Sequence, residues 1–177
     1  MDCELRKKTF WIGAVLIILG GVWLFFDVWE SNSQTLEVRV GGSVILAEVA
    51  DSAEERARGL SGRNRLEKGR GMIFLFDPSA SRSDSEESSD SKSSGQAQPA
   101  VQGFWMKDMR FPIDIIWIRD GIVIGFEESV PAPAISVSES ELPVYVSPGK
   151  VDMVLEISSG EVERLGIEVG DKFEVVI

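Results

Sequence analysis

The chain opens with one long apolar stretch and then changes to short runs in which apolar and polar positions alternate. Residues 10–26 (FWIGAVLIILGGVWLFF) carry no charge and follow Arg6, Lys7 and Lys8. A helix rises about 1.5 Å per residue, so this stretch is just long enough to cross a bilayer. The preceding cations predict a cytoplasmic N-terminus, and no small-residue cleavage signal follows. We predict a single-pass cell-membrane protein, with stub and transmembrane anchor over residues 1–30 and an extracytoplasmic C-terminal domain. A cleaved signal peptide and a buried core helix are the alternatives.

The first alternating runs follow a linker at residues 31–35. Residues 36–40 (LEVRV) alternate apolar and charged side chains, and Gly41-Gly42 separates them from residues 43–49. Glycine tolerates the positive φ values of tight hairpin turns. The pattern therefore predicts a β-hairpin at the start of the outer domain.

Two short helices are predicted further along. Ser52 and Glu55 have the spacing of a capping box, and Gly59 supplies a stop. Residues 161–165 form one or two turns before Gly166. Because neither segment is long enough to connect parallel strands as a crossover helix, the pattern favours an antiparallel arrangement.

The remaining apolar runs predict a mainly β fold. They are typical of strands and occupy residues 71–76, 103–106, 113–118, 122–126, 151–157 and 172–177. Residues 130–148 are rich in proline and serine and are predicted to be a loop covering one end. Residues 79–100 contain no large apolar side chain and are predicted to be a disordered insertion. The predicted fold is a compact antiparallel sandwich or barrel-like domain over residues 36–177 with two short helices, preceded by the transmembrane helix.

Composition excludes several kinds of site. The net charge of −11 argues against a nucleic-acid partner, because phosphates are neutralised by clustered Lys and Arg. The chain has no histidine, and Cys3 is its one cysteine. A Ser-His-Asp triad, a Cys-His pair, a structural zinc site and an internal disulfide are therefore impossible. We predict no cofactor and no nucleic-acid partner.

One segment reverses the overall charge. Residues 56–70 carry a single acid, Glu67, beside the basic residues Arg56, Arg58, Arg63, Arg65, Lys68 and Arg70. Glycines in this segment let the backbone expose N–H groups, which together with arginine side chains often hold anions. The favoured interpretation is a set of exposed bases that balance neighbouring acids or hold the loop through backbone carbonyls. The alternative is a patch that faces an anion.

The stretch 101–118 (VQGFWMKDMRFPIDIIWI) joins two apolar runs through a charged turn. Pro112 stiffens the far side of the turn, and Asp114 is a lone carboxylate inside the second run. Such a carboxylate needs a hydrogen-bond donor, access to solvent or a raised pKa. We expect Lys107 and Asp114 to face the basic segment. For Asp114 itself the favoured interpretation is structural: it accepts backbone or Lys/Arg hydrogen bonds that hold the turn, and a functional acid is the alternative.

Four stretches in order carry a family resemblance. ADSAEERARGLSGRNRLEKGRGMIFLF, GFWMKDMRFPIDIIWI, YVSPGK followed by VLEISSG, and GIEVGD together resemble domain-of-unknown-function family 192, also called uncharacterised protein family 0127. The resemblance covers residues 36–177 without the serine-rich insertion. It implies a compact, mainly β fold and no established activity. The chain departs from the family at Asp108-Met109, where Asn-Thr is typical, and at Ser61, where methionine is usual.

We predict a noncatalytic domain that binds a small anionic ligand or a partner protein on the outer face of the membrane. An aromatic surface beside converging charges would form the ligand-binding site, and its predicted residues are Arg58, Arg63, Arg70, Trp105, Lys107 and Asp114. Two alternatives stay open. One is a hydrolase or lyase that uses Asp114 as acid or base beside Lys107. The other is a soft-metal site of thioether ligands, namely Met72, Met106 and Met109.

Overall fold

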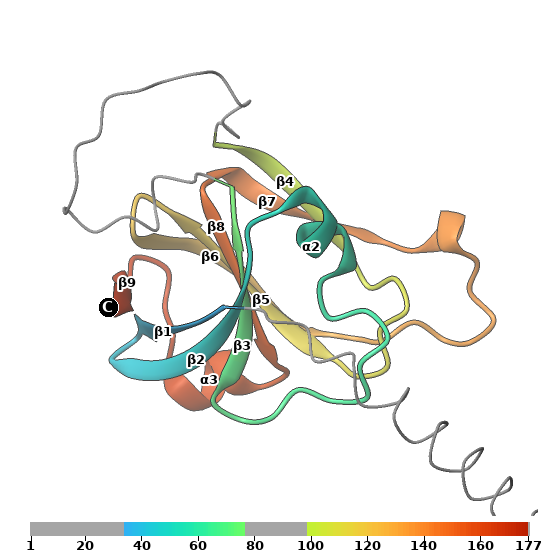
Figure 1. Cartoon of the computed structure of the whole chain (residues 1–177), viewed down its shortest axis with the longest axis horizontal. Helices are drawn as coiled ribbons and strands as arrows, with labels where there is room; N and C mark the ends of the chain where they lie inside the picture. Colours follow the sequence, from blue (N-terminus) through green and yellow to red (C-terminus); the bar gives the residue numbers. More distant parts are fainter. Residues whose placement is uncertain (1–33, 77–98, 177) are drawn as a thin grey trace, which may run out of the picture. The chain divides into compact units, whose positions relative to one another are not determined.

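The structure is a computed structural model that describes residues 34–76 and 99–176 (Figure 1). The predicted anchor over residues 1–30 lies outside the described residues. So does the predicted insertion over residues 79–100, apart from its last two positions, and Ala100 already belongs to a strand. Within the described ranges, no helix combines the length and apolar character needed to cross a membrane.

The described residues form a mainly β fold with two short α-helices. The elements in chain order are β1 (Thr35–Val40), β2 (Ser43–Ala50), α2 (Ala53–Arg58), β3 (Arg70–Leu75), β4 (Ala100–Trp105), β5 (Ile113–Arg119), β6 (Ile122–Val130), the 3-10 turn η2 (Glu139–Glu141), β7 (Val144–Val151), β8 (Met153–Ser158), α3 (Glu161–Leu165) and β9 (Phe173–Val176). The sequence therefore predicted the mainly β character of the fold and both short helices.

The strands form one large curled sheet and one small one. The large sheet has the order β6-β5-β8-β3-β2-β1-β9, and β4 pairs with β7 in a separate two-stranded ribbon. The large sheet curls into a half-barrel (Figure 1). Its first and last strands meet at one end, where Val123 N donates to Asp171 O at 2.9 Å and Phe173 N donates to Gly121 O at 2.8 Å.

The helix α2 has the predicted caps at both ends. The Ser52 hydroxyl accepts from Glu55 N at 3.2 Å, and the Glu55 carboxylate accepts from Ser52 N at 3.1 Å. This reciprocal pair confirms the capping box. Gly59 ends the helix at φ 51°, where its N–H donates to Glu55 O at 2.8 Å. A side chain at Gly59 would be strained and would crowd the ring of Phe74, so this turn needs glycine.

The prediction of purely antiparallel pairing is wrong at one place. Strands β2 and β3 run parallel, from the pair Leu46 and Arg70 to the pair Ala50 and Phe74. A parallel pair needs a connection of about a dozen residues or more, and a helix usually supplies it. Here residues 51–69 supply that length with the short α2 and an extended loop, so no long helix is required.

The prediction of a loop over all of residues 130–148 is also wrong, because its last part begins strand β7. Proline is tolerated there because the pairing with β4 shifts register between Val101 and Gly103. At this irregularity the Ser147 hydroxyl accepts from Gln102 N at 3.0 Å and donates to Gly149 O at 2.6 Å. The serine side chain thus replaces backbone bonds that an irregular strand lacks.

Two apolar clusters pack on opposite faces of the large sheet. Leu155 and Ile157 of β8 belong to the first cluster. Val154 of the same strand belongs to the second, which also contains Phe74 and Trp117. Side chains alternate along a strand, so Glu156 lies on the face of Val154. That face is covered by α2 and β4, and a pocket lies between them.

Candidate functional site

A pocket of ≈ 270 Å³ lies where the α2 turn meets β4. Figure 1 shows α2 beside the β4–β7 ribbon. The pocket has an aromatic wall, and charged and polar side chains contribute a large part of the rest of its lining. The lining residues are Arg56, Ala57, Arg58, Gly59, Leu60, Ser61, Phe74, Phe76, Gln102, Gly103, Phe104, Trp105, Met109 and Glu156.

Edge-to-face aromatic contacts fix one wall of the pocket. The Phe104 ring packs against Phe74 with centroids 4.9 Å apart and against Trp117 at 5.5 Å. Such pairs are favourable beyond the area that they bury. The wall is therefore formed before any ligand arrives.

Glu156 is the buried polar residue of the pocket. It lies in the middle of β8, between Met72 of β3 and Ile115 of β5, and is only 6% exposed. Burial raises the pKa of Glu156 to about 8, although the positive charge of Arg63 acts in the opposite direction. Its carboxyl makes no hydrogen bond within the part of the chain that the structure describes. At neutral pH this side chain is therefore mostly a neutral carboxylic acid.

Arg63 lies near Glu156 but is bound elsewhere. Its guanidinium donates to both carboxylate oxygens of Glu48, at 2.5 and 2.7 Å. Glu48 and Glu156 are both paired with Met72 in the sheet, from its two sides. The two-pronged bond to Glu48 raises the pKa of Arg63. Arg63 therefore acts on Glu156 through its charge and not through a hydrogen bond.

The two arginines of α2 that line the pocket differ in their bonding. Arg56 is committed to the protein: it donates to the carbonyls of Asp51 and Leu75, and its guanidinium lies 5.4 Å from the centroid of the Phe76 ring. Arg58 makes a single 3.3 Å bond to the exposed Glu54. An exposed pair of this kind contributes little, so Arg58 is the cation that a ligand can recruit.

Lys107 lies in a second, adjacent hollow. That hollow shares Ser61 and Met109 with the first pocket. The Lys107 ammonium is 2.8 Å from the carboxylate of Glu139 and 5.4 Å from the centroid of the Trp105 ring. The bond to Glu139 raises the pKa of Lys107, so this side chain is a stable cation.

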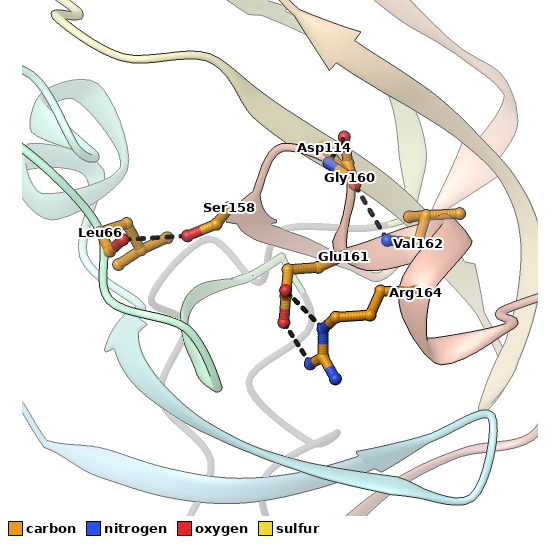
Figure 2. Close-up of polar contacts among 7 residues, drawn as sticks. All are labelled: Leu66, Asp114, Ser158, Gly160, Glu161, Val162 and Arg164. Atoms are coloured by element: carbon orange, nitrogen blue, oxygen red, sulfur yellow. Dashed lines mark hydrogen bonds and ion pairs between the residues drawn. The ribbon is translucent and has the colours of Figure 1, made fainter.

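Asp114 of β5 binds the backbone at the end of β6 and at the start of α3, and Figure 2 shows its position beside Gly160 and Val162 of α3. One carboxylate oxygen accepts from Ser129 N at 2.7 Å and Gly160 N at 3.1 Å, and the other accepts from Val162 N at 2.9 Å. Gly160 is the first cap residue of α3 and has no side chain to satisfy the helix amides. Asp114, which is fully buried, reaches over from β5 and does so instead. The contacts of Asp114 therefore agree with the structural role, in which its carboxylate accepts backbone hydrogen bonds.

Neighbouring contacts fix the same corner (Figure 2). The Glu161 carboxylate accepts from the Arg164 guanidinium at 2.7 and 2.5 Å, and Ser158 Oγ donates to Leu66 O at 3.0 Å. The bonds from Arg164 hold the pKa of Glu161 below its usual range. These contacts hold α3, the basic segment and β5 together, so this corner has a structural role.

The structure brings together only some of the predicted site residues. Arg58 and Trp105 line the pocket, and Lys107 stacks on Trp105 in the adjacent hollow. Arg63 is bound to Glu48. Arg70 is an exposed residue at the start of β3 and Asp114 is buried under α3, and neither lines either hollow.

Sequence reasoning missed Glu156, although a signal was present. VDMVLEI holds a carboxylate inside a buried apolar strand, the same feature that drew attention to Asp114. The sequence pattern predicts only a strand over residues 151–157. In the structure Met153, Val154, Leu155, Glu156 and Ile157 are all buried, because both faces of β8 are covered.

The three methionines of the soft-metal alternative are packed in the second apolar cluster. Met72, Met106 and Met109 are all buried there. Methionine commonly fills irregular gaps in cores. In the described residues, no group of three or more acidic or cysteine side chains has the arrangement of a metal site. Core packing accounts for these methionines.

Asp108 occupies a backbone conformation that favours asparagine and aspartate. Its φ is 56°, and its carbonyl accepts from Gly62 N at 2.9 Å, while the Ser61 hydroxyl donates to Lys107 O at 2.7 Å. The two departures from the family pattern, at Ser61 and at Asp108-Met109, therefore lie where the basic segment contacts the charged turn that carries Lys107 and Asp108. Asparagine and aspartate tolerate left-handed backbone better than other side chains, so the backbone geometry is kept.

We expect Asp108→Asn to change the free energy of unfolding by less than about 0.5 kcal/mol. Asp108→Val should lower it by roughly 1–2 kcal/mol, because a β-branched side chain is strained in the left-handed region. Urea denaturation of the two variants measures the difference. Equal stabilities would show that the turn relaxes to another conformation.

The described residues form a mainly β domain with a half-barrel sheet and a pocket under α2. Comparison with known protein families and solved structures identifies related proteins. The sequence profile of family DUF192, described as an uncharacterized ACR, matches residues 36–85 and 95–175. The chain belongs to this family. No match was found among curated proteins.

Two solved structures are similar to the chain. A protein of unknown function from Novosphingobium aromaticivorans DSM 12444 is 30% identical, with a TM-score of 0.63, and the match covers 82% of this chain and 89% of that one. A "putative transcription regulator" from Sinorhizobium meliloti 1021 is 26% identical, with a TM-score of 0.62, and the match covers 82% of this chain and 97% of that one. These similarities leave the activity to be argued from the site.

Proposed function

We propose that this domain is a noncatalytic binding protein for a small organic anion with an apolar body, held in the pocket between α2 and β4. The observation that carries the proposal is the pocket itself. It has rigid aromatic walls, and the weakly paired Arg58 stands beside them. An apolar body would lie against Phe74 and Phe104, and the anionic group would recruit Arg58.

The size of the pocket limits the ligand. An apolar cavity of about 150 Å³ is large enough for benzene. The ≈ 270 Å³ pocket therefore suits one aromatic ring or a comparable aliphatic body with short substituents.

The contacts of the alternative catalytic pair favour binding over hydrolysis or elimination. Asp114 uses both oxygens on backbone amides, and Lys107 is a cation bound to Glu139. A general base must reach the proton that it removes. Asp114 lines neither hollow, so it has no route to a substrate in them.

A ligand screen on the full-length chain tests the proposal. Benzoate and short phenyl-substituted carboxylates should raise the melting temperature, and the matched amides should raise it less. Arg58→Gln should weaken carboxylate binding about fivefold, the effect of losing roughly 1 kcal/mol. Arg65→Gln is the matched control, because Arg65 is 80% exposed and does not line the pocket. If no carboxylate binds, or if both variants weaken binding equally, the proposal is wrong.

We also propose that residues 1–30 anchor the domain on the outer face of the cell membrane. The support is the uncharged stretch at residues 10–26 behind three cations. After alkaline carbonate washing the chain should stay in the membrane fraction, and protease added outside should digest the domain. Release into the wash, or protection from the protease, would contradict this proposal.

A further inference from the structure

Glu156 presents a polar group in the pocket that the protein itself does not satisfy. It is 6% exposed, lines the pocket and makes no hydrogen bond within the described part of the chain. Burying a polar group without a partner costs stability. An apolar side chain would pack between Met72 and Ile115 without that cost. The retained carboxyl is therefore available to a ligand.

The charged groups around Glu156 do not take up its carboxyl. Arg63 is bound through two hydrogen bonds to Glu48 across the sheet. On the α2 side, Arg56 donates to backbone carbonyls and Arg58 to Glu54. Arg56 and Arg63 are bound to other groups, and Arg58 has only its weak bond to Glu54, so none of the three is bonded to the Glu156 carboxyl. Burial therefore keeps the carboxyl protonated near neutral pH. A protonated carboxyl is a hydrogen-bond donor.

We infer that Glu156 determines the specificity of this pocket by donating a hydrogen bond to a neutral carbonyl oxygen of the ligand. The inference rests on the proposed function and names its ligand class: a small aromatic or apolar acid that carries an acyl or keto group. The carboxylate of the ligand pairs with Arg58, and its carbonyl accepts from Glu156. Ionised Glu156 has no proton to donate, so the preference for a ligand with a carbonyl group requires the protonated residue.

Two ligands of nearly the same shape test this inference. 4-Acetylbenzoate has the carbonyl oxygen, and 4-isopropenylbenzoate has a carbon in its place. Calorimetry on the full-length wild-type chain should give about tenfold tighter binding of the acetyl compound at pH 6, the effect of one hydrogen bond. At pH 9, with Glu156 ionised, the preference should disappear.

Variants separate the hydrogen bond from the charge. Glu156→Gln keeps an N–H donor and should prefer the acetyl compound at both pH values, whereas Glu156→Leu should prefer neither. The wild-type measurements decide the matter if Glu156→Leu does not fold. Equal or reversed affinities at pH 6, or a preference unchanged at pH 9, overturn the inference and leave the proposed function standing. Failure of both compounds to bind counts against the proposed function itself.

Discussion

Asp114→Asn is expected to lower the free energy of unfolding by roughly 2–4 kcal/mol, because a buried acceptor of three backbone hydrogen bonds loses its charge and part of its acceptor capacity. The Asn amide can accept through one oxygen only. Its NH₂ group must then face an amide N–H of Ser129, Gly160 or Val162, which is a repulsive contact. Urea denaturation at pH 7 measures the loss.

Glu174→Gln is the matched control for this variant. Glu174 forms a 3.5 Å surface pair with Arg39 and is 57% exposed, so its change should stay within about 0.5 kcal/mol. A loss for Asp114→Asn no larger than that of the control would show that the three hydrogen bonds contribute little. An intact melting temperature together with loss of a measured activity would instead revive the catalytic alternative for Asp114.

The roles of the two buried carboxylates could be predicted from sequence only in part. A lone Asp114 in an apolar run signals a buried acceptor or a functional acid. Deciding between these needs the position of Gly160, which lies 46 residues further along the chain and is a long-range neighbour. Glu156 gave the same local signal within VDMVLEI. The segment was predicted only as a strand, because the strand's own sequence does not reveal that α2 and β4 cover the face that carries Glu156.

Local rules succeeded where the structure is local. The capping box at Ser52, the stop at Gly59 and the glycine hairpin between β1 and β2 depend on residues within a few positions of each other. The parallel pairing of β2 with β3 and the strand β7 depend on distant partners. Proline normally argues against a strand. Pro148 is accepted in β7 because the pairing with β4 shifts register opposite it, and that shift cannot be predicted from the local sequence.

In the candidate site too, residue types could be recognised from the sequence, whereas their partners from distant parts of the chain could not. The sequence brought Arg58, Trp105 and Lys107 into one hypothesis because their residue types suit an anion beside an aromatic surface. Arg63 belonged to that hypothesis by type alone. Its two bonds to Glu48 across the sheet remove it as a ligand contact and turn it into the charge beside Glu156. Residue type alone therefore does not show which cation is already bound within the protein.

Wild-type stability is expected to fall as pH rises from about 4.5 toward 8, by at most about 1.4 kcal/mol per pH unit. The pKa of Glu156 rises from 4.5 to about 8 on folding, so between these values the folded state holds a proton that the unfolded state has lost. The contribution of Glu156 is full below the unfolded pKa and is gone above the folded pKa. The chain has no histidine, the side chain that ordinarily titrates in this window.

Glu156→Gln should remove most of this slope and make the domain more stable than wild type at pH 7, by up to about 3 kcal/mol. Glu161→Gln is the matched control with the opposite sign. Arg164 holds the pKa of Glu161 below its ordinary value, so Glu161 stabilises the fold above that value and loses its contribution as pH falls through the folded pKa. Its replacement should therefore destabilise the domain at pH 7 and leave the slope above pH 4.5 intact. Urea denaturation between pH 5 and 9 distinguishes the two variants, and a wild-type slope that persists in Glu156→Gln would show that Glu156 is ionised in the folded domain.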